Sequence, residues 1–554
     1  MKKIISLALV LIMTVTFSVP AFAVVSPDYN VPIITLRGDG SDIYDASGEN
    51  IVWPASFGDE EGDKDALINS VMDVIFPHLV NGLLTGDYEG YYDAFYDAIL
   101  PLFEDSHLDT DGNPSNGTQL DPSKQADNAY NIKYDKKTWH GGKYEKSDYT
   151  FWYDWRLSPL ETAEKLDEYI TAVMQVTGAK QISLAGICLG GCPVLAYLDL
   201  YLKKLEANPG MAPYIKNVIF DATVANDCTA FTDSFRGKVD VDVDALQRFL
   251  DEYVDPNENT FDGLEDTVPF LNELIFTSYE LLREVGVADS IVGELEDFYD
   301  VIYAGLVPKL VIASYANFPG YWAAVDAQYH KEAVDFVFAE PEMREEYAGF
   351  IAKINRYYDE VSSRRNEIIA LCQEKGTHFG AIAKYGTQAM PFTERQNEIS
   401  DRLVTIESAS FGATTAKTVN DILPESYIAQ RTELGYGEYI SADKQIDLST
   451  ALFRDSTWII KNCNHDNWDH EGAIVEAFCH STGMTTKNDT TWARFLVCDD
   501  ETGTLTPMTQ ENPGEDIWDN TDNTTAQSTV MTKLAAFFRW LTAIFKTLTN
   551  LFNK

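Results

Sequence analysis

Gln181-Ile-Ser-Leu-Ala-Gly-Ile-Cys-Leu-Gly190 is the stretch of this chain from which the fold can be predicted. Its first five residues are typical of a short buried β-strand, and the residues from Val194 to Leu205 favour a helix. Between them lies Gly186-Ile-Cys-Leu-Gly190, a turn whose glycines let the chain pass sharply from strand to helix and keep side chains away from the cysteine. The pattern therefore predicts that Cys188 is held at the tip of a tight turn.

The same alternation of strands and helices continues on both sides of this turn. Val31–Leu36 and the aromatic run Tyr149–Trp155 favour strands, and a helical pattern opens at Pro159 and closes at Gly178, a natural helix C-cap. Further short strands are predicted at 218–220, 457–460 and 493–497. Such alternation is typical of an α/β fold, a mostly parallel sheet with helices on both faces.

The strand rhythm is lost between about residues 240 and 434, where acidic and aromatic helical patterns dominate. We interpret this stretch as a largely helical cap inserted into the α/β core. The predicted core then comprises residues 24–239 and 435–508, followed by an acidic linker over 509–527 and an amphipathic helix over 528–554.

The N-terminus is typical of a secretory signal peptide over residues 1–23. Lys2 and Lys3 precede an apolar run from Ile4 to Val19, and Ala21-Phe-Ala23 supplies small residues for cleavage. An uncleaved N-terminal membrane anchor is the alternative. We expect the mature protein to be secreted or to lie on the outer cell surface.

Composition limits the partners of the chain. The 554 residues carry a formal net charge of -45, so phosphate-rich nucleic acids would be repelled and we expect no nucleic-acid partner. Seven cysteines are too few for a disulfide scaffold of this length. Their odd number leaves at least one without a partner within the chain.

The C-terminal 27 or so residues differ from the rest of the chain in charge and pattern. From Val530 to Phe552, apolar residues recur at spacings of three and four, and the only charges are basic. A basic amphipathic helix is typical of contact with a membrane surface. The alternative is a helix that packs on the protein's own core.

An enzyme that forms an acyl intermediate needs a nucleophile, a base, an acid that orients the base, and amide groups that bind the oxyanion. Cys188 is the candidate nucleophile, and the following helix N-terminus would favour its thiolate. The alternative role, a small buried packing residue, fits Cys192 better. The oxyanion donors would be the amides of Leu189 and Asp39, with Gly40 in place of Asp39 as the alternative.

With this kind of turn, the chain order is nucleophile, acid, base. His465 follows a predicted strand and is the candidate base, while His470 and His480 are weaker alternatives. The candidate acids are Asp443 and Asp447, which lie in the loop before that strand. The chemistry requires no metal and no cofactor.

Three segments resemble the lecithin:cholesterol acyltransferase and lipase branch of the α/β hydrolases. They are Leu36–Tyr44 with Trp53-Pro54, Tyr153-Asp-Trp-Arg156, and Asp443-Lys-Gln-Ile-Asp447. The resemblance implies an α/β-hydrolase fold with an inserted helical cap, and it favours Asp443 over Asp447 as the acid. The segment His465-Asp-Asn is similar to the one that carries the family's catalytic base.

Cys188 departs from this branch, which has serine at that position. A cysteine followed by two glycines in the turn resembles polyhydroxyalkanoate synthases instead. The pattern therefore predicts an exported lipid-type ester hydrolase or acyltransferase acting through a thioester. The alternatives are a thioesterase, an amidase, a polyester-forming enzyme, or a binding protein without catalysis on the same scaffold. The acyl chain, the acceptor and the oligomeric state are not predicted.

Overall fold

A computed structural model describes residues 31–38, 41–53, 149–238 and 311–514, with short gaps at 392, 466–469 and 500–501, and parts of 74–131 and 305–309. The predicted signal peptide and C-terminal helix lie outside these residues, as do Asp39 and Gly40. No helix in the described part of the chain is long and apolar enough to cross a membrane.

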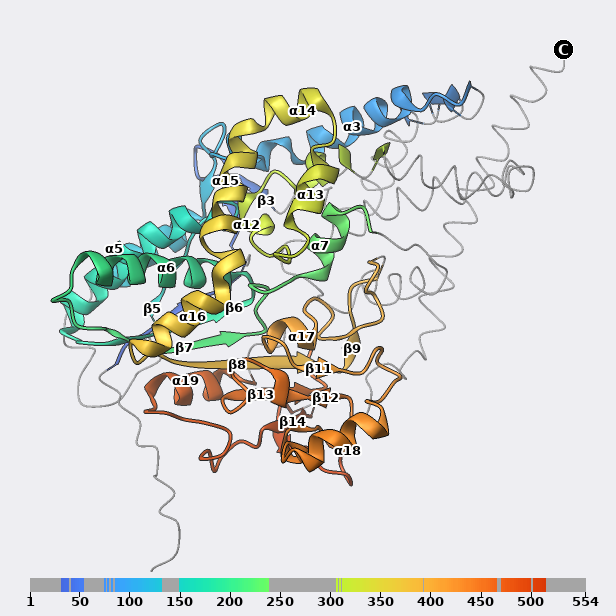
Figure 1. The fold of residues 1–554 in the computed structure, drawn as a ribbon. Helices are drawn as coiled ribbons and strands as arrows, with labels where there is room; N and C mark the ends of the chain where they lie inside the picture. Colours follow the sequence, from blue (N-terminus) through green and yellow to red (C-terminus); the bar gives the residue numbers. More distant parts are fainter. Residues whose placement is uncertain are drawn as a thin grey trace, which may run out of the picture.

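The fold is built around an eight-stranded sheet in the order β15-β14-β13-β8-β7-β6-β1-β5 (Figure 1). All neighbouring strands run parallel except β15, which is antiparallel to β14. The strands of this sheet are β1 Ile33–Leu36, β5 Tyr149–Thr150, β6 Ile182–Ile187, β7 Ile215–Asp221, β8 His378–Tyr385, β13 Thr457–Lys461, β14 Phe495–Cys498 and β15 Leu505–Pro507.

Three smaller sheets lie outside this one: β2-β3-β4, β9-β10 and β11-β12. Their strands are β2 Ile43–Tyr44, β3 Ile51–Trp53, β4 Gln119–Leu120, β9 Thr387–Gln388, β10 Ile399–Ser400, β11 Thr414–Thr415 and β12 Ile446–Asp447. Asp401 directly follows β10, and Asp447 is the last residue of β12.

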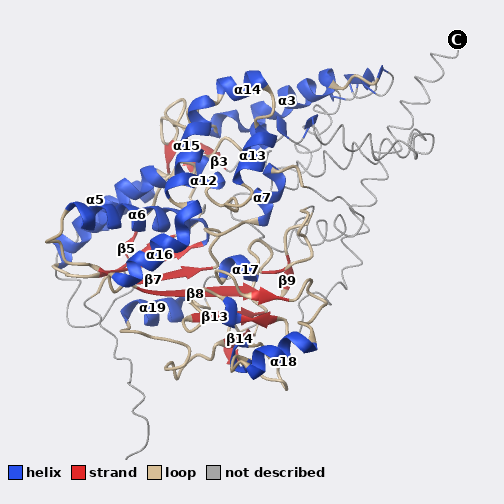
Figure 2. Ribbon diagram, in the orientation of Figure 1, coloured by secondary structure: helices blue, strands red, loops and turns tan. Residues whose placement is uncertain are grey.

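Helices cover both faces of the main sheet, with α5, α6 and α16 on one side and α19 on the other (Figure 2). Both faces are buried because parallel strands are connected by helices that pack back on the sheet. The helices are α3 Glu89–Phe103, α4 Pro122–Asn131, α5 Pro159–Thr177, α6 Gly191–Ala207, α7 Thr229–Phe235, α12 Pro319–Trp322, α13 His330–Val337, α14 Pro341–Glu346, α15 Ala348–Glu360, α16 Arg365–Glu374, α17 Ile406–Ala409, α18 Glu425–Glu433 and α19 Gly472–His480.

The predicted α/β class is confirmed, and most elements near the cysteine turn lie where the sequence predicted them. β1, β6, α6, β7, β13 and β14 match predicted segments within a few residues. α5 ends at Thr177 because Gly178 adopts a left-handed conformation with φ 71°, which glycine tolerates without strain. The aromatic run that begins at Tyr149 contributes only two residues to the sheet.

The predicted boundary of the cap at residue 434 is wrong. β8 lies inside the predicted insertion, yet it pairs with β7 on one side and with β13 on the other. It is therefore a central strand of the sheet. Helices α12 to α16 precede β8; α12 to α15 lie together at one end of the molecule, whereas α16 packs beside α6 on the main sheet (Figure 1). The segment after β8 lies at the edge of the sheet where the parallel strands have their carboxyl ends.

Parallel strands bring their carboxyl ends to one edge of the sheet, where ligands usually bind in open α/β folds. Cys188 follows β6, and His465 follows β13. The loop after β8 runs along the same edge through β9 and β10. The topology thus brings together residues that are far apart in the sequence.

Candidate active site

Cys188 occupies a strained backbone turn directly after β6. Its φ is 52°, in the left-handed region that residues other than glycine seldom adopt. A short 3-10 turn over Cys188–Gly190 leads into α6. The carbonyl of Cys188 accepts hydrogen bonds from the Thr223 hydroxyl at 3.0 Å and from the amide of Val224 at 3.3 Å. The loop after β7 therefore stabilises the strained conformation.

The glycines of this turn are required by close backbone contacts. A Cβ atom on Gly190 would lie 2.2 Å from the carbonyl oxygen of Leu36, and one on Gly186 would lie 2.9 Å from the Cα of Gly191. Neither contact can be relieved by moving a side chain. The two glycines therefore let β1, β6 and α6 approach one another closely enough to form the turn.

His465 is held by Asp401, which is the first residue after β10. The Nδ1 atom of His465 lies 2.9 Å from Oδ2 of Asp401, and the amide of His465 donates to the carbonyl of Asp401 at 2.9 Å. Both side chains are buried, with 3% and 0% exposed. The ring is thus fixed at two points, as expected for a histidine whose tautomer and orientation matter.

The other oxygen of Asp401 is held by the backbone. Its Oδ1 atom accepts from the amide of Val404 at 2.7 Å and from the amide of Leu403 at 3.1 Å. These bonds fix the carboxylate so that Oδ2 faces the imidazole.

The charge of His465 is shaped by two neighbours. Burial lowers the pKa of His465, but the Asp401 carboxylate and the Cys188 thiol raise it more, so the net pKa is well above the usual value. A hydrogen bond between the ring and Cys188 is among the causes. The imidazole therefore lies between the thiol and the carboxylate, and these neighbours favour its protonated form.

The prediction that Asp443 orients His465 is wrong, because Asp401 occupies that position. The Oδ2 atom of Asp443 accepts from the Tyr385 hydroxyl at 2.6 Å and from the ammonium of Lys461 at 3.2 Å. Its Oδ1 atom accepts from the Ser441 hydroxyl at 2.5 Å. Asp443 is thus part of a separate ion pair at the base of its loop.

Asp447, the alternative acid, also lies away from His465. Its Oδ2 atom accepts from the Tyr427 hydroxyl and from Arg431, each at 2.8 Å. Its Oδ1 atom accepts from the amide and hydroxyl of Ser449. This fully buried carboxylate joins α18 to the strand β12 and has a structural role.

The weaker histidine candidates lie at the two ends of one helical segment. His470 is half-buried and precedes α19, and His480 is the last residue of α19 and fully buried. Cys188 is among the groups that act on His465. Among the three histidines, the structure brings His465 to the cysteine.

Asp401 was missed because the sequence shows it inside the predicted cap. Two signals near it were available. The run His378–Tyr385 is apolar enough for a buried strand, and Ile399-Ser-Asp401 is a short apolar segment followed by a carboxylate. If β8 is recognised as a core strand, the chain order of nucleophile, acid and base points to this loop.

Gly38 lies directly against the cysteine turn. A Cβ atom on Gly38 would lie 3.1 Å from Sγ of Cys188 and 3.3 Å from the amide nitrogen of Leu189. The segment after β1 therefore passes over both the sulfur and one of the two predicted oxyanion donors. Asp39, the other predicted donor, and its alternative Gly40 fall outside the described residues.

The Tyr153-Asp-Trp-Arg156 segment braces the loop after β1. The Tyr153 hydroxyl donates to the carbonyl of Arg37 at 2.9 Å, and the Trp155 indole donates to the carbonyl of Ser41 at 3.0 Å. These two bonds hold both ends of the short segment that contains Asp39. The segment thus contributes to the site by positioning the loop that follows β1.

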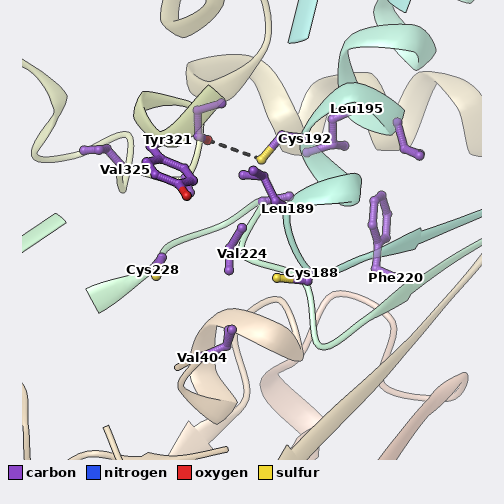
Figure 3. Packing of buried hydrophobic residues seen from close by; sticks show 14 of the residues in the cluster. Cys188, Leu189, Cys192, Leu195, Phe220, Val224, Cys228, Tyr321, Val325 and Val404 are labelled. Carbon is purple, nitrogen blue, oxygen red and sulfur yellow. Dashed lines mark hydrogen bonds between the residues drawn. The ribbon is translucent and has the colours of Figure 1, made fainter. Parts of the chain in front are cut away.

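Cys188 and Cys192 differ in their surroundings. Cys192 is fully buried in α6, its sulfur lies 3.6 Å from the carbonyl of Ala323, and burial raises the pKa of its thiol. Such a thiol is a packing residue. Cys188 retains 7% exposure, and its sulfur points away from α6 (Figure 3).

Apolar side chains gather around the space that the Cys188 sulfur faces. Figure 3 shows Val224, Cys228 and Val404 around it, from the loop after β7 and the loop after Asp401. All three are buried. The sulfur of Cys188 is therefore bordered by apolar side chains and interacts with the imidazole of His465.

In the part of the chain that the structure describes, no group of three or more His, Cys, Asp or Glu side chains has an arrangement that could hold a metal ion. Comparison of the chain with protein-family models and with curated proteins found no match. The assignment of a function therefore depends on the geometry of the site.

Proposed function

We propose that this chain is an acyl-transfer enzyme with an α/β-hydrolase fold, in which Cys188, His465 and Asp401 act as nucleophile, base and acid. The observation that carries the proposal is one continuous contact series. The Asp401 carboxylate holds the His465 imidazole, and the imidazole is influenced by the thiol of Cys188. Cys188 lies in a strained turn at the carboxyl end of a central strand, as nucleophiles of this class do.

The chemistry follows from the protonation states of the pair. The thiolate of Cys188 attacks the carbonyl carbon of an ester, and the imidazolium of His465 then protonates the departing alkoxide, leaving a thioester on Cys188. Neutral His465 next takes a proton from water or an alcohol, which attacks the thioester. Collapse of that intermediate releases the acid or the new ester and restores the thiolate beside the imidazolium.

Oxyanion binding would use the amide of Leu189 and an amide from the loop after β1, which we expect to be that of Asp39. Support for this role comes from Gly38, which lies against Cys188, and from the hydrogen bonds that hold the loop at Arg37 and Ser41.

The substrate class that fits best is an ester of an apolar acyl group. Val224, Cys228 and Val404 offer hydrocarbon next to the sulfur and no charge. We also propose that helices α12 to α15 belong to a cap over the site, and that the protein is exported and contacts a membrane surface through residues 528–554.

An activity screen of esters, thioesters and amides tests this proposal, with wild type and Cys188→Ala measured side by side. We expect hydrolysis of apolar esters by the wild type and a loss of about three orders of magnitude or more in the variant. Equal rates in the two proteins would contradict the proposal. Adding alcohol acceptors and identifying the products would separate hydrolysis from transfer.

A further inference from the structure

A buried ion pair contacts the backbone of His465. Lys384, on β8, and Glu471, the residue before α19, are both 0% exposed, and their Nζ and Oε1 atoms lie 2.9 Å apart. The same Nζ atom donates to the backbone carbonyl of His465 at 2.9 Å. The lysine therefore joins an acidic side chain to the main chain of the candidate base.

This pair faces other ionisable groups on the same side of the sheet. Asp221, at the end of β7, is in register with Ile382, two residues from Lys384 and thus on the same face. Burial, followed by the nearby Glu471, raises the pKa of Asp221 well above its usual range. The groups that act on Lys384 or His465 from the packed elements include Asp221, Asp401, Cys188 and Cys463, and Cys498 in turn acts on Cys463.

Lys384 with Glu471 and His465 with Asp401 form two neighbouring buried pairs, each with its nitrogen and oxygen 2.9 Å apart. The bond from Nζ of Lys384 to the carbonyl of His465 joins the two pairs.

We propose that Lys384 and Glu471 are positioning residues for His465, which they hold at its backbone carbonyl so that the imidazole stays between Asp401 and Cys188. This inference rests on the proposed function, because it requires that Cys188 and His465 form the reacting pair. The amide of His465 donates to the carbonyl of Asp401, its Nδ1 atom contacts the Asp401 carboxylate, and its carbonyl accepts from Lys384. His465 is therefore fixed at three points. The short loop after β13 is thereby attached to β8 and α19.

The matched control is Lys461, a second buried lysine on the neighbouring strand. Lys461 is 4% exposed and pairs with a buried carboxylate. It is in register with Tyr385 and not with Lys384, so it points to the opposite face of the sheet. Its loss removes a buried cation of the same type without touching His465.

The experiment measures how fast iodoacetamide alkylates Cys188 between about pH 5 and pH 10, since only the thiolate reacts. The test variant is Lys384→Met with Glu471→Gln, which removes both charges together and leaves no unpaired buried ion. Glu471→Gln alone is the second variant, for use if the double variant does not fold. Wild type, His465→Ala and Lys461→Met complete the series, and peptide mass spectrometry assigns the label to Cys188.

We expect wild-type Cys188 to react rapidly below pH 8, and the double variant to be about tenfold slower there. The rates should converge near pH 10, where a thiol ionises without help. Glu471→Gln alone should lose a few-fold, and Lys461→Met should keep the wild-type profile. A merely structural role would not shift the pH profile in this way.

Two different failures can be told apart. If Cys188 reacts fast in the wild type and slowly in His465→Ala, but the profiles of the double variant and of Glu471→Gln match the wild type, the positioning role is wrong and the proposed site stands. If wild-type Cys188 reacts no faster than a simple thiol at pH 7, the proposed reacting pair is itself contradicted, and the inference falls with it.

Discussion

Two carboxylates at the same edge of the sheet have opposite surroundings. Asp443 is bound by a hydroxyl on each oxygen and by the ammonium of Lys461. Asp401 is bound by two backbone amides on one oxygen and by the imidazole of His465 on the other. The partner of Asp443 is therefore an ammonium group, whereas the partner of Asp401 is an imidazole, a group suited to proton transfer.

This difference shows what distinguishes the carboxylate proposed as the acid from a structural one. The Asp401 side chain is fully buried and that of Asp443 is only 9% exposed, and both lie in loops that a sequence pattern could assign to the acid. Only Asp401 has an oxygen directed at a group that also interacts with Cys188. The partner of the carboxylate, and not its burial or its sequence context, identifies the candidate acid.

Replacing each carboxylate by its amide should give the largest contrast. Asp401→Asn keeps an oxygen that accepts from the backbone amides, but its side chain carries no charge to stabilise a protonated His465. We therefore expect kcat/KM for an apolar ester to fall about 10³-fold to 10⁴-fold. Asp443→Asn should change it less than about fivefold. Steady-state kinetics on the substrate found in the activity screen make the comparison. The reverse order of effects would restore Asp443 as the acid.

Stability should show the opposite contrast. Asp443→Leu leaves the ammonium of Lys461 buried without a carboxylate, and we expect a loss of about 3 kcal/mol in the free energy of unfolding. Asp401→Asn keeps most of its hydrogen bonds and should cost about 1 kcal/mol. Urea titrations followed by circular dichroism measure both values. Adding Lys461→Met to Asp443→Leu should recover most of the loss, and no recovery would argue against an ion pair.

The pH dependence of stability should distinguish the two sites as well. Because the pKa of folded His465 is raised, its protonation stabilises the native state fully below the unfolded pKa of about 6.5. That stabilisation is lost as pH rises through the folded pKa. The difference in unfolding free energy between wild type and His465→Gln should therefore shrink as pH rises above about 6.5. A difference that grows over this range would contradict the raised pKa.

A smaller effect is expected from a substitution of Gly38, which lies against Cys188. Gly38→Ala would bring a methyl group to 3.1 Å from the Cys188 sulfur, closer than ordinary contact. We expect kcat/KM to fall about tenfold, with a change in unfolding free energy within about 1 kcal/mol. Kinetics and urea titration of the same preparation check both. Unchanged kinetics would mean that this loop is not near the reacting carbonyl.

The parts of the fold that could be predicted are those encoded locally. The turn at Cys188 depends on two glycines and a strand that precedes them, and the strand β13 before His465 is a short apolar run. Both signals lie within ten residues. They were sufficient to predict the α/β class, the cysteine turn, and the residue that the structure brings to it from β13.

The acid could not be predicted in the same way, because its role depends on contacts across the sheet. His378–Tyr385 follows directly on α16, and a short apolar run can belong to a buried helix or to a strand. Without β8 in the core, Asp401 falls in the insertion and Asp443 becomes the nearest candidate. The ion pair between Lys461 and Asp443 has no local signal in the sequence.

The most direct test of the account is to find where an acyl group becomes attached. Protein is mixed with a p-nitrophenyl ester of an apolar acid, quenched in acid within seconds, and digested for peptide mass spectrometry. The account predicts an acyl thioester on Cys188 in the wild type and in Asp443→Asn. In Asp401→Asn the same adduct should form about 10³-fold more slowly. An adduct on a different residue, or equal rates in the two aspartate variants, would contradict the assignment of Cys188, His465 and Asp401.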